Sequence, residues 1–212
     1  MVTFMPDLAK FKMTHLEDDD VVLMLKRVYD IAGILGVTVQ VVFNGSQLHM
    51  QKGFPQYVYN YIKHPPSKTY EDLPWIYEKV NDQWEVGMSL SGGQFRQVSF
   101  VNKFATTAGG THVDYVSEMI VSYVLSLMKK KYKNYEIGEQ EVKDQLWVFV
   151  SAQIGNPTFD SPNKTTLTTV QEEFGSECVL SDQFFKYVHS SCIMAMVMKQ
   201  KKACGRTSAG MY

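Results

Sequence analysis

Cysteine is scarce in this sequence, and long apolar runs are missing from it. The three cysteines, Cys178, Cys192 and Cys204, lie far apart and form no C-x-x-C pair. This spacing argues against a disulfide framework and against a cysteine-based metal site, and it indicates a reducing compartment. No apolar run approaches the roughly 20 residues of a membrane-spanning helix, and the N-terminus lacks the features of a signal peptide. We therefore expect a soluble chain with no membrane partner.

The sequence also lacks an excess of charge of either sign. Its 212 residues include 21 lysines and arginines and 22 acidic residues, which gives a formal net charge of −1. Contact with nucleic acid would therefore have to use a local basic patch, because the chain as a whole supplies no basic field. The 45% content of hydrophobic residues is ordinary for a globular protein with a buried core.

Hydrophobic periodicity predicts helices and strands that interleave without strict alternation. Helices are expected over about residues 15–35, 54–63, 113–131 and 181–201, with a short helix near Val142. Strands are expected over about residues 37–43, 47–50, 75–80, 84–91, 94–106 and 146–152, with a polar surface loop over 67–74. This order predicts an α+β fold, with a mixed β-sheet, helices mainly on one face and one long helix over 113–131.

The segment 97–115 leads from a strand into that long helix. Val98, Phe100 and Phe104 are expected on one face of the strand, and polar Ser99 and Asn102 on the other. Such alternation predicts a single half-buried strand.

A glycine pair ends this strand. Without a Cβ atom, Gly109 and Gly110 let the backbone turn sharply or approach another group closely. Thr111 is expected to cap the helix that follows. His112, at the helix start, is expected to be a neutral hydrogen-bonding partner that fixes the turn. These four residues therefore form a predicted structural turn.

The segment closely resembles the transducer domain of eukaryotic type IIA DNA topoisomerases, which reads very like Val-Ser-Phe-Val-Asn, then Ala-Thr, then Gly-Gly-Thr-His-Val-Asp. Three further blocks carry the resemblance in the same order: PDLAKFKM at 6–13, KRVYDIAG at 26–33, and LWVFV at 146–150 leading into NPTFDS at 156–161. The resemblance implies a transducer domain with a ribosomal protein S5 domain 2-like fold over 1–186. A divergent C-terminal helix and tail follow over 187–212.

The resemblance implies part of an ATP-dependent type II topoisomerase, in which the transducer couples ATP binding to motion of the DNA gate. The implied partners are double-stranded DNA and a homodimer mate or an intact topoisomerase, in the nucleus. ATP would act through an upstream ATPase domain, and Mg²⁺ only in the full enzyme. The family's ATPase motifs, its Glu-Gly-Asp-Ser site and its DNA-cleaving tyrosine are not found in the 212 residues. We therefore expect this chain alone neither to hydrolyse ATP nor to cleave DNA.

Lys164 is the candidate nucleotide-binding residue. It lies on the loop after the apolar strand 146–152, and a lysine ammonium suits a terminal phosphate, although taken alone it is an ordinary solvated lysine. In the resembling enzymes this loop reads Gln-Thr-Lys after Phe-Asp-Ser, and its lysine reaches the γ-phosphate of ATP. Lys164 matches that lysine. Pro162 and Asn163 replace the glutamine and threonine, which removes one phosphate contact and stiffens the backbone.

The most concentrated basic patch is Lys-Lys-Lys-Tyr-Lys at 129–133. It ends the long helix, where the helix dipole favours cations, and this effect alone accounts for it. Such a patch also contacts DNA phosphates without reading base sequence. In the resembling enzymes a lysine loop here meets the DNA segment that passes the gate, which assigns DNA contact to Lys129, Lys130 and Lys131.

Other readings stay open. The chain could be a non-catalytic DNA-binding module, a dimerisation or decoy module, or a non-functional truncated product. It offers no catalytic residue and no metal ligands at a recognised spacing. The acidic residues 18–20 are expected to be a solvated capping cluster at a helix N-terminus.

Overall fold

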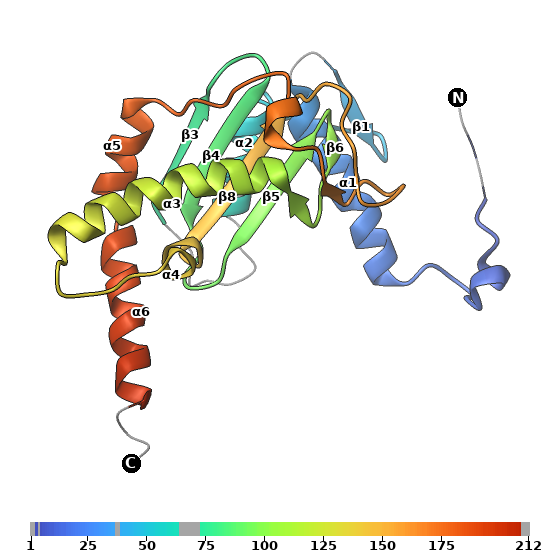
Figure 1. Cartoon of the computed structure of the whole chain (residues 1–212). Coiled ribbons are helices and arrows are strands. Elements are labelled where there is room, and N and C mark those ends of the chain that lie inside the picture. Colours follow the sequence, from blue (N-terminus) through green and yellow to red (C-terminus); the bar gives the residue numbers. More distant parts are fainter. Residues whose placement is uncertain (1–2, 4, 37–38, 64–72, 209–212) are drawn as a thin grey trace.

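The computed structural model describes residues 3, 5–36, 39–63 and 73–208. A five-stranded sheet lies between helices, with α3 across its front and α2 behind it (Figure 1). The helices are η1 Leu8–Phe11, α1 Asp18–Leu35, α2 Phe54–Lys63, α3 Thr111–Lys131, α4 Glu139–Lys143, η4 Gln171–Glu173, α5 Asp182–Ser190 and α6 Ile193–Ser208. The strands are β1 Val41–Phe43, β2 Ser46–Leu48, β3 Trp75–Lys79, β4 Trp84–Leu90, β5 Arg96–Val101, β6 Phe104–Ala105, β7 Gly109–Gly110, β8 Leu146–Ala152 and β9 Thr166–Leu167.

The central strand of the sheet is β8. The strand order is β3-β4-β8-β5-β6, with β8 antiparallel to β4 and parallel to β5. All seven residues of β8 are buried, as its almost wholly apolar sequence predicts. The mixed sheet and the long helix α3 confirm the predicted α+β class.

The two faces of the sheet have separate cores because successive side chains of a strand point to opposite faces. From β8, Leu146, Val148 and Val150 pack with residues of α3, α4, α5 and α6, whereas Trp147 and Phe149 pack with residues of α2. Burial of each of these large side chains contributes roughly 1.5–3 kcal/mol. Most helices therefore share one face of the sheet, and α2 covers the other together with Ile34 at the end of α1.

The Asn44-Gly45 hairpin is confirmed. β1 and β2 pair antiparallel, and the turn residues have φ values of 48° and 79°, as tight hairpin turns require. Both strands are shorter than predicted. Residues 37–38 of the first predicted strand and residues 67–72 of the predicted loop lie outside the described residues.

The predicted single strand over 94–106 is wrong in its second half. β5 stops before a two-residue turn at Asn102 and Lys103, and the chain reverses into β6. Both turn residues have positive φ, 50° and 71°, which matches the twist of paired strands. The Asn102 amide exchanges hydrogen bonds of 2.8 and 2.9 Å with the Ile154 backbone. Phe104 therefore leaves the half-buried face predicted for it and lies 53% exposed on β6.

Two helix boundaries also differ from the prediction. α1 starts later than expected, with Glu17 at the cap position, because the Asp20 carboxylate accepts the Glu17 N–H at 3.2 Å. The single helix predicted over 181–201 is two helices, because the extended backbone of Ser191 (ψ 162°) ends α5 before α6 begins. Ser181 caps α5 as predicted, since its hydroxyl accepts the Phe184 N–H at 3.2 Å.

α1 carries about half-exposed apolar side chains, most of them in its first two turns. We call these side chains the exposed α1 face: Val21, Val22, Leu23, Met24 and Ile31. Only the end of the helix is buried, where Ala32 and Ile34 are less than 10% exposed. The helix therefore meets the rest of the fold through one end.

A short parallel pair, β7 with β9, ties the start of α3 to the segment after β8. A Cβ atom on Gly110 would lie 2.3 Å from the Leu167 carbonyl oxygen and 2.5 Å from its nitrogen. The φ of Gly110 is 124°, which L side chains rarely adopt. The glycine pair therefore permits a close approach of two backbones, one of the two roles that the sequence predicts for it.

Replacing Gly110 with alanine should lower the free energy of unfolding by about 3 kcal/mol or more, since backbone strain adds to a clash with backbone atoms. Gly93→Ala is the matched control, because Gly93 has a φ of 115° but no atom within 4 Å of its ideal Cβ position. Gly93→Ala should lower the free energy of unfolding only by the cost of backbone strain at positive φ, about 1–3 kcal/mol. Urea denaturation measures both, and equal losses would contradict the close packing of β7 on β9.

Candidate functional site

The loop between β8 and β9 is held together by the Asp160 carboxylate. This carboxylate accepts hydrogen bonds from the Thr166 N–H at 2.9 Å, the Thr166 hydroxyl at 3.0 Å and the Thr165 hydroxyl at 3.0 Å. These donors, led by the backbone N–H of Thr166, hold the pKa of Asp160 below its ordinary value. The loop backbone around residues 161–164 is therefore fixed from within.

Lys164 lies folded back over this loop. Its backbone has a φ of 57°, and its N–H donates to the Ser161 carbonyl at 3.0 Å. The side-chain Nζ lies 3.8 Å from the centre of the Phe104 ring and 5.6 Å from the centre of the Phe159 ring. Within the described ranges the ammonium has no carboxylate partner. Aromatic faces and solvent thus surround its charge.

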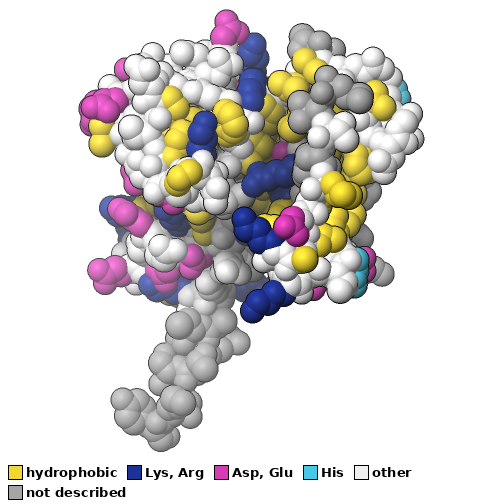
Figure 2. Space-filling model, turned by 90° about the vertical axis from the view of Figure 1, so that its right-hand side faces the viewer, with side chains coloured by type: hydrophobic (Ala, Val, Ile, Leu, Met, Phe, Trp, Pro, Cys, Tyr) yellow, Lys and Arg dark blue, Asp and Glu magenta, His cyan; other side chains and the backbone are white. Residues whose placement is uncertain are grey.

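Pro162 and Asn163 are exposed next to Lys164. Asn163 lines a cavity of about 290 Å³ together with Arg27 of α1 and Lys103 of the β5–β6 turn. On this side of the molecule Figure 2 shows a furrow in which Lys and Arg side chains gather. The structure therefore brings the predicted nucleotide loop close to two cations from distant parts of the sequence.

The predicted structural turn joins this loop to α3. Thr111 is the first residue of α3 and does not cap it, because the cap position belongs to Gly110. The Thr111 hydroxyl instead donates to the Thr169 carbonyl at 2.6 Å. Three residues before Thr111, the Ala108 N–H donates to the Thr165 carbonyl at 2.9 Å. The capping prediction is wrong, and the same threonine helps to fasten α3 to the segment after Lys164.

His112 is completely buried at the start of α3. Its Nε2 lies 3.1 Å from the Thr106 hydroxyl, which lies 2.6 Å from the Ser99 hydroxyl. Burial lowers the pKa of His112 to about 4, so the ring is neutral near pH 7. Nδ1 has no hydrogen-bond partner among the described residues.

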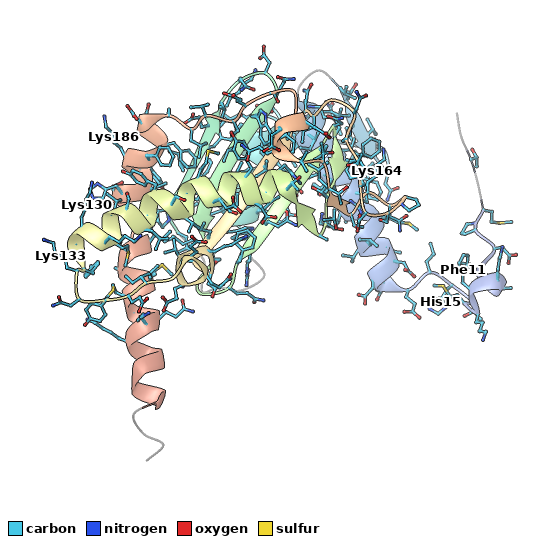
Figure 3. All side chains as sticks on the ribbon, viewed as in Figure 1. Phe11, His15, Lys130, Lys133, Lys164 and Lys186 are labelled. Atoms are coloured by element: carbon cyan, nitrogen blue, oxygen red, sulfur yellow. The ribbon has the colours of Figure 1, made fainter. Side chains whose placement is uncertain are left out.

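The lysines at 129–131 are exposed in the last turn of α3. The Lys131 Nζ lies 5.5 Å from the centre of the Tyr132 ring. Figure 3 places Lys130 and Lys133 at one end of α3 and Lys164 near the other. The structure thus does not bring the predicted DNA-contact residues near the predicted nucleotide loop.

Sequence reasoning gave no role in a functional site to three residues of this region: Lys103, Phe104 and Asp160. Asp160 was part of the Phe-Asp-Ser block, and the two threonines that follow at 165–166 were the available signal for a loop closed by a carboxylate. Phe104 and Lys164 lie far apart in the sequence, and no periodic pattern links them.

Other classes of site are not evident in the part of the chain that the structure describes. Those residues contain no group of three or more His, Cys, Asp or Glu side chains placed to hold a metal ion. None of the described helices combines the length and apolar character needed to cross a bilayer.

Comparisons with known proteins agree on one family. A family model described as DNA gyrase B matches residues 53–207. The chain is 54% identical to DNA topoisomerase 2 of Arabidopsis thaliana over 194 residues, which are 91% of this chain and 13% of that protein. The chain thus spans a small part of that relative's length.

Solved structures match the fold. The ATPase region of Saccharomyces cerevisiae topoisomerase II has a TM-score of 0.82 at 34% identity, with 92% of this chain and 48% of that chain covered. The ATPase and transducer domains of DNA topoisomerase II from Balamuthia mandrillaris have a TM-score of 0.80 at 32% identity, with 95% and 49% covered.

The burial of His112 predicts a dependence of stability on pH. Its pKa is about 4 in the folded chain against an ordinary 6.5, so the unfolded chain binds the extra proton as pH falls between these values. The contribution of His112 to the free energy of unfolding should therefore be fully present above about pH 6.5. It should decrease as the pH falls toward 4, by as much as roughly 3 kcal/mol.

Urea denaturation between about pH 7 and about pH 4.5 measures this slope. His112→Gln removes the titrating ring and should flatten the slope, whereas His189→Gln, at an exposed position, should leave it unchanged. Identical slopes for the parent chain and His112→Gln would refute the assignment to His112.

Proposed function

Because this chain belongs to the type II DNA topoisomerase family, we propose that it is the transducer segment of such an enzyme. In this role it couples the binding of ATP to the motion of the DNA gate. We assign the transducer domain to residues 1–186, with 187–212 as a divergent C-terminal helix and tail.

The observation that carries this proposal is the bonded path from the Lys164 loop to α3. The loop leads directly into β9, β9 pairs with β7, and β7 leads directly into α3. The Thr111 hydroxyl and the Ala108 N–H add hydrogen bonds across the same junction. A force on Lys164 would therefore be delivered to the first turn of the helix. A helix of 21 residues carries that displacement about 30 Å, to the lysines at 129–131.

The nucleotide contact is assigned to Lys164, with Asn163 and Pro162 shaping the loop. ATP supplies the phosphate charge when it is bound in the ATPase region, and Mg²⁺ belongs to the full enzyme. The Lys164 side chain suits this contact because the described residues offer its ammonium no competing carboxylate. Arg27 and Lys103 beside Asn163 add positive charge to the same side.

The exposed α1 face supports a domain contact within the same enzyme. Exposed apolar side chains that lie close together on a protein surface often mark a site of contact with another domain or protein. The solved relatives carry about as much chain again as the part matched here, since 48% of the yeast ATPase region is covered. We assign the exposed α1 face to contact with that ATPase domain.

Double-stranded DNA and a second subunit are the proposed partners, and the nucleus is the proposed location. The DNA contact uses Lys129, Lys130 and Lys131, which are exposed and need no base-specific groups to meet phosphates. The same exposed lysines favour a second candidate function, a DNA-binding module without coupling to ATP.

The coupling proposal is tested in a chimera of the A. thaliana enzyme in which this chain replaces the matched segment. Lys164→Ala should lower kcat/KM for ATP roughly 10- to 100-fold, because a hydrogen bond to a charged phosphate is lost. Lys186→Ala is the control, since Lys186 is exposed on α5 and lies far from Lys164 (Figure 3). Equal activity of the two variants would count against nucleotide sensing by Lys164.

The DNA contact is tested on the chain itself by binding to duplex DNA at several salt concentrations. Alanine at 129, 130 and 131 together should reduce the slope of log affinity against log salt by about 2–3 and weaken all sequences alike. A control removes the same charge from scattered exposed positions: Lys10, Lys52 and Lys186. If both triple variants change the slope equally, binding reflects net charge and not this patch.

A further inference from the structure

We propose that Phe104 holds the Lys164 ammonium in a resting position from which a phosphate group must draw it away. Phe104 is then a positioning residue for nucleotide sensing, and this role rests on the function proposed above. No sequence motif pointed to Phe104, and no other described contact explains why an aromatic ring stands exposed on the edge strand β6.

The contact itself is close. The Lys164 Nζ lies 3.8 Å from the centre of the Phe104 ring, well inside the roughly 6 Å over which a ring face attracts a cation. Phe159 is farther, at 5.6 Å. The other described lysine–ring pairs are also longer, 5.1 Å for Lys143 with Phe95 and 5.5 Å for Lys131 with Tyr132. Phe104 is therefore the main partner of the ammonium.

Both ends of the contact are fixed by other groups. The loop backbone at Lys164 is set by the Asp160 hydrogen bonds and by the Lys164 N–H to the Ser161 carbonyl. The backbone that carries the ring is set by the Asn102-Lys103 turn, which the Asn102 amide fastens to Ile154. The lysine side chain can therefore leave the ring without a change in either backbone. The stack is thus a position of one side chain and not a packing contact on which the fold depends.

The surroundings favour release by an anion. Arg27 and Lys103 line the adjacent cavity. Its one carboxylate, Asp30, already has three partners: Lys26 at 2.8 Å, the Tyr57 hydroxyl at 2.6 Å and Arg27 at 3.8 Å. Lys26, Arg27 and Lys103 together therefore outnumber this single negative charge. A phosphate entering there meets excess positive charge. Its charge-assisted hydrogen bond to an ammonium is stronger than an exposed cation–ring contact, so the lysine transfers to the phosphate.

The resting position is measured on the 212-residue chain by NMR with [¹³Cε]-lysine, where Lys164→Arg identifies the Lys164 signal. The Phe104 ring current should displace the Lys164 Hε resonances upfield of those of the other lysines. Phe104→Leu should abolish the displacement and Phe104→Tyr should keep it. Phe11→Leu is the matched control, because it removes another exposed ring far from Lys164 (Figure 3).

Release is measured by adding inorganic tripolyphosphate to the same sample, which should return the Lys164 Hε resonances to the position of the other lysines. In the chimera, Phe104→Leu should lower the ATP concentration for half-maximal ATPase activity about two- to fivefold, because no resting contact has to be broken. Circular dichroism confirms that the variant is folded.

An undisplaced Lys164 signal in the parent chain overturns the resting position, whether or not Lys164 senses ATP. A displaced signal that tripolyphosphate does not move, with an unchanged ATP dependence in Phe104→Leu, overturns the role in sensing. Failure of the proposed function itself is read separately, from an ATPase activity that Lys164→Ala leaves unchanged. In that case the stack is a surface contact only.

Discussion

The close approach of the Gly110 backbone to Leu167 is the constraint on which the rest of the site depends. Two short strands can pair here only because no Cβ atom stands between them. The pairing decides where α3 begins, since the helix starts directly after β7. It also decides where Lys164 lies, since β9 follows the loop that carries this residue. The absence of a side chain at Gly110 therefore fixes the position of Lys164 relative to the start of α3.

This constraint makes the site a junction between the loop that carries Lys164 and the start of α3. Its buried polar groups, His112, Thr106 and Ser99, form a chain of hydrogen bonds below the turn. Burial keeps the His112 pKa low, so the ring contributes no charge at neutral pH and acts as packed structure. The lysines that the proposal uses lie instead toward the surface, with 129–131 at one end of α3 and Lys164 near the other (Figure 3). Under the proposed function, such an arrangement separates the part that would transmit a displacement from the parts that would touch phosphates.

Features governed by local rules were predictable from the sequence. The apolar run of β8, the Asn44-Gly45 hairpin and the Ser181 cap are patterns of neighbouring residues, and each is present. The prediction failed where a local preference was weak. Lysine as a residue type rarely adopts positive φ, and Lys103 therefore gave no hint of the turn that splits the predicted strand 94–106. Asn102 was the single residue there that favours such a turn. The amide bonds from Asn102 to Ile154 that favour this turn are tertiary contacts.

The candidate site also combines features that the local sequence predicts with features that only tertiary contacts define. Lys164 could be selected because its loop matches a family pattern, but its position over Phe104 joins segments whose proximity only the fold defines. By the resemblance seen in the sequence, Lys164 matches the family's loop, whereas Pro162 and Asn163 differ from it. When one flexible side chain makes a ligand contact, the strength of that contact depends on the position of the side chain before the ligand binds. Under the proposed function, the aromatic ring beside Lys164 therefore has more influence on phosphate binding than it would in a loop that keeps a second phosphate contact.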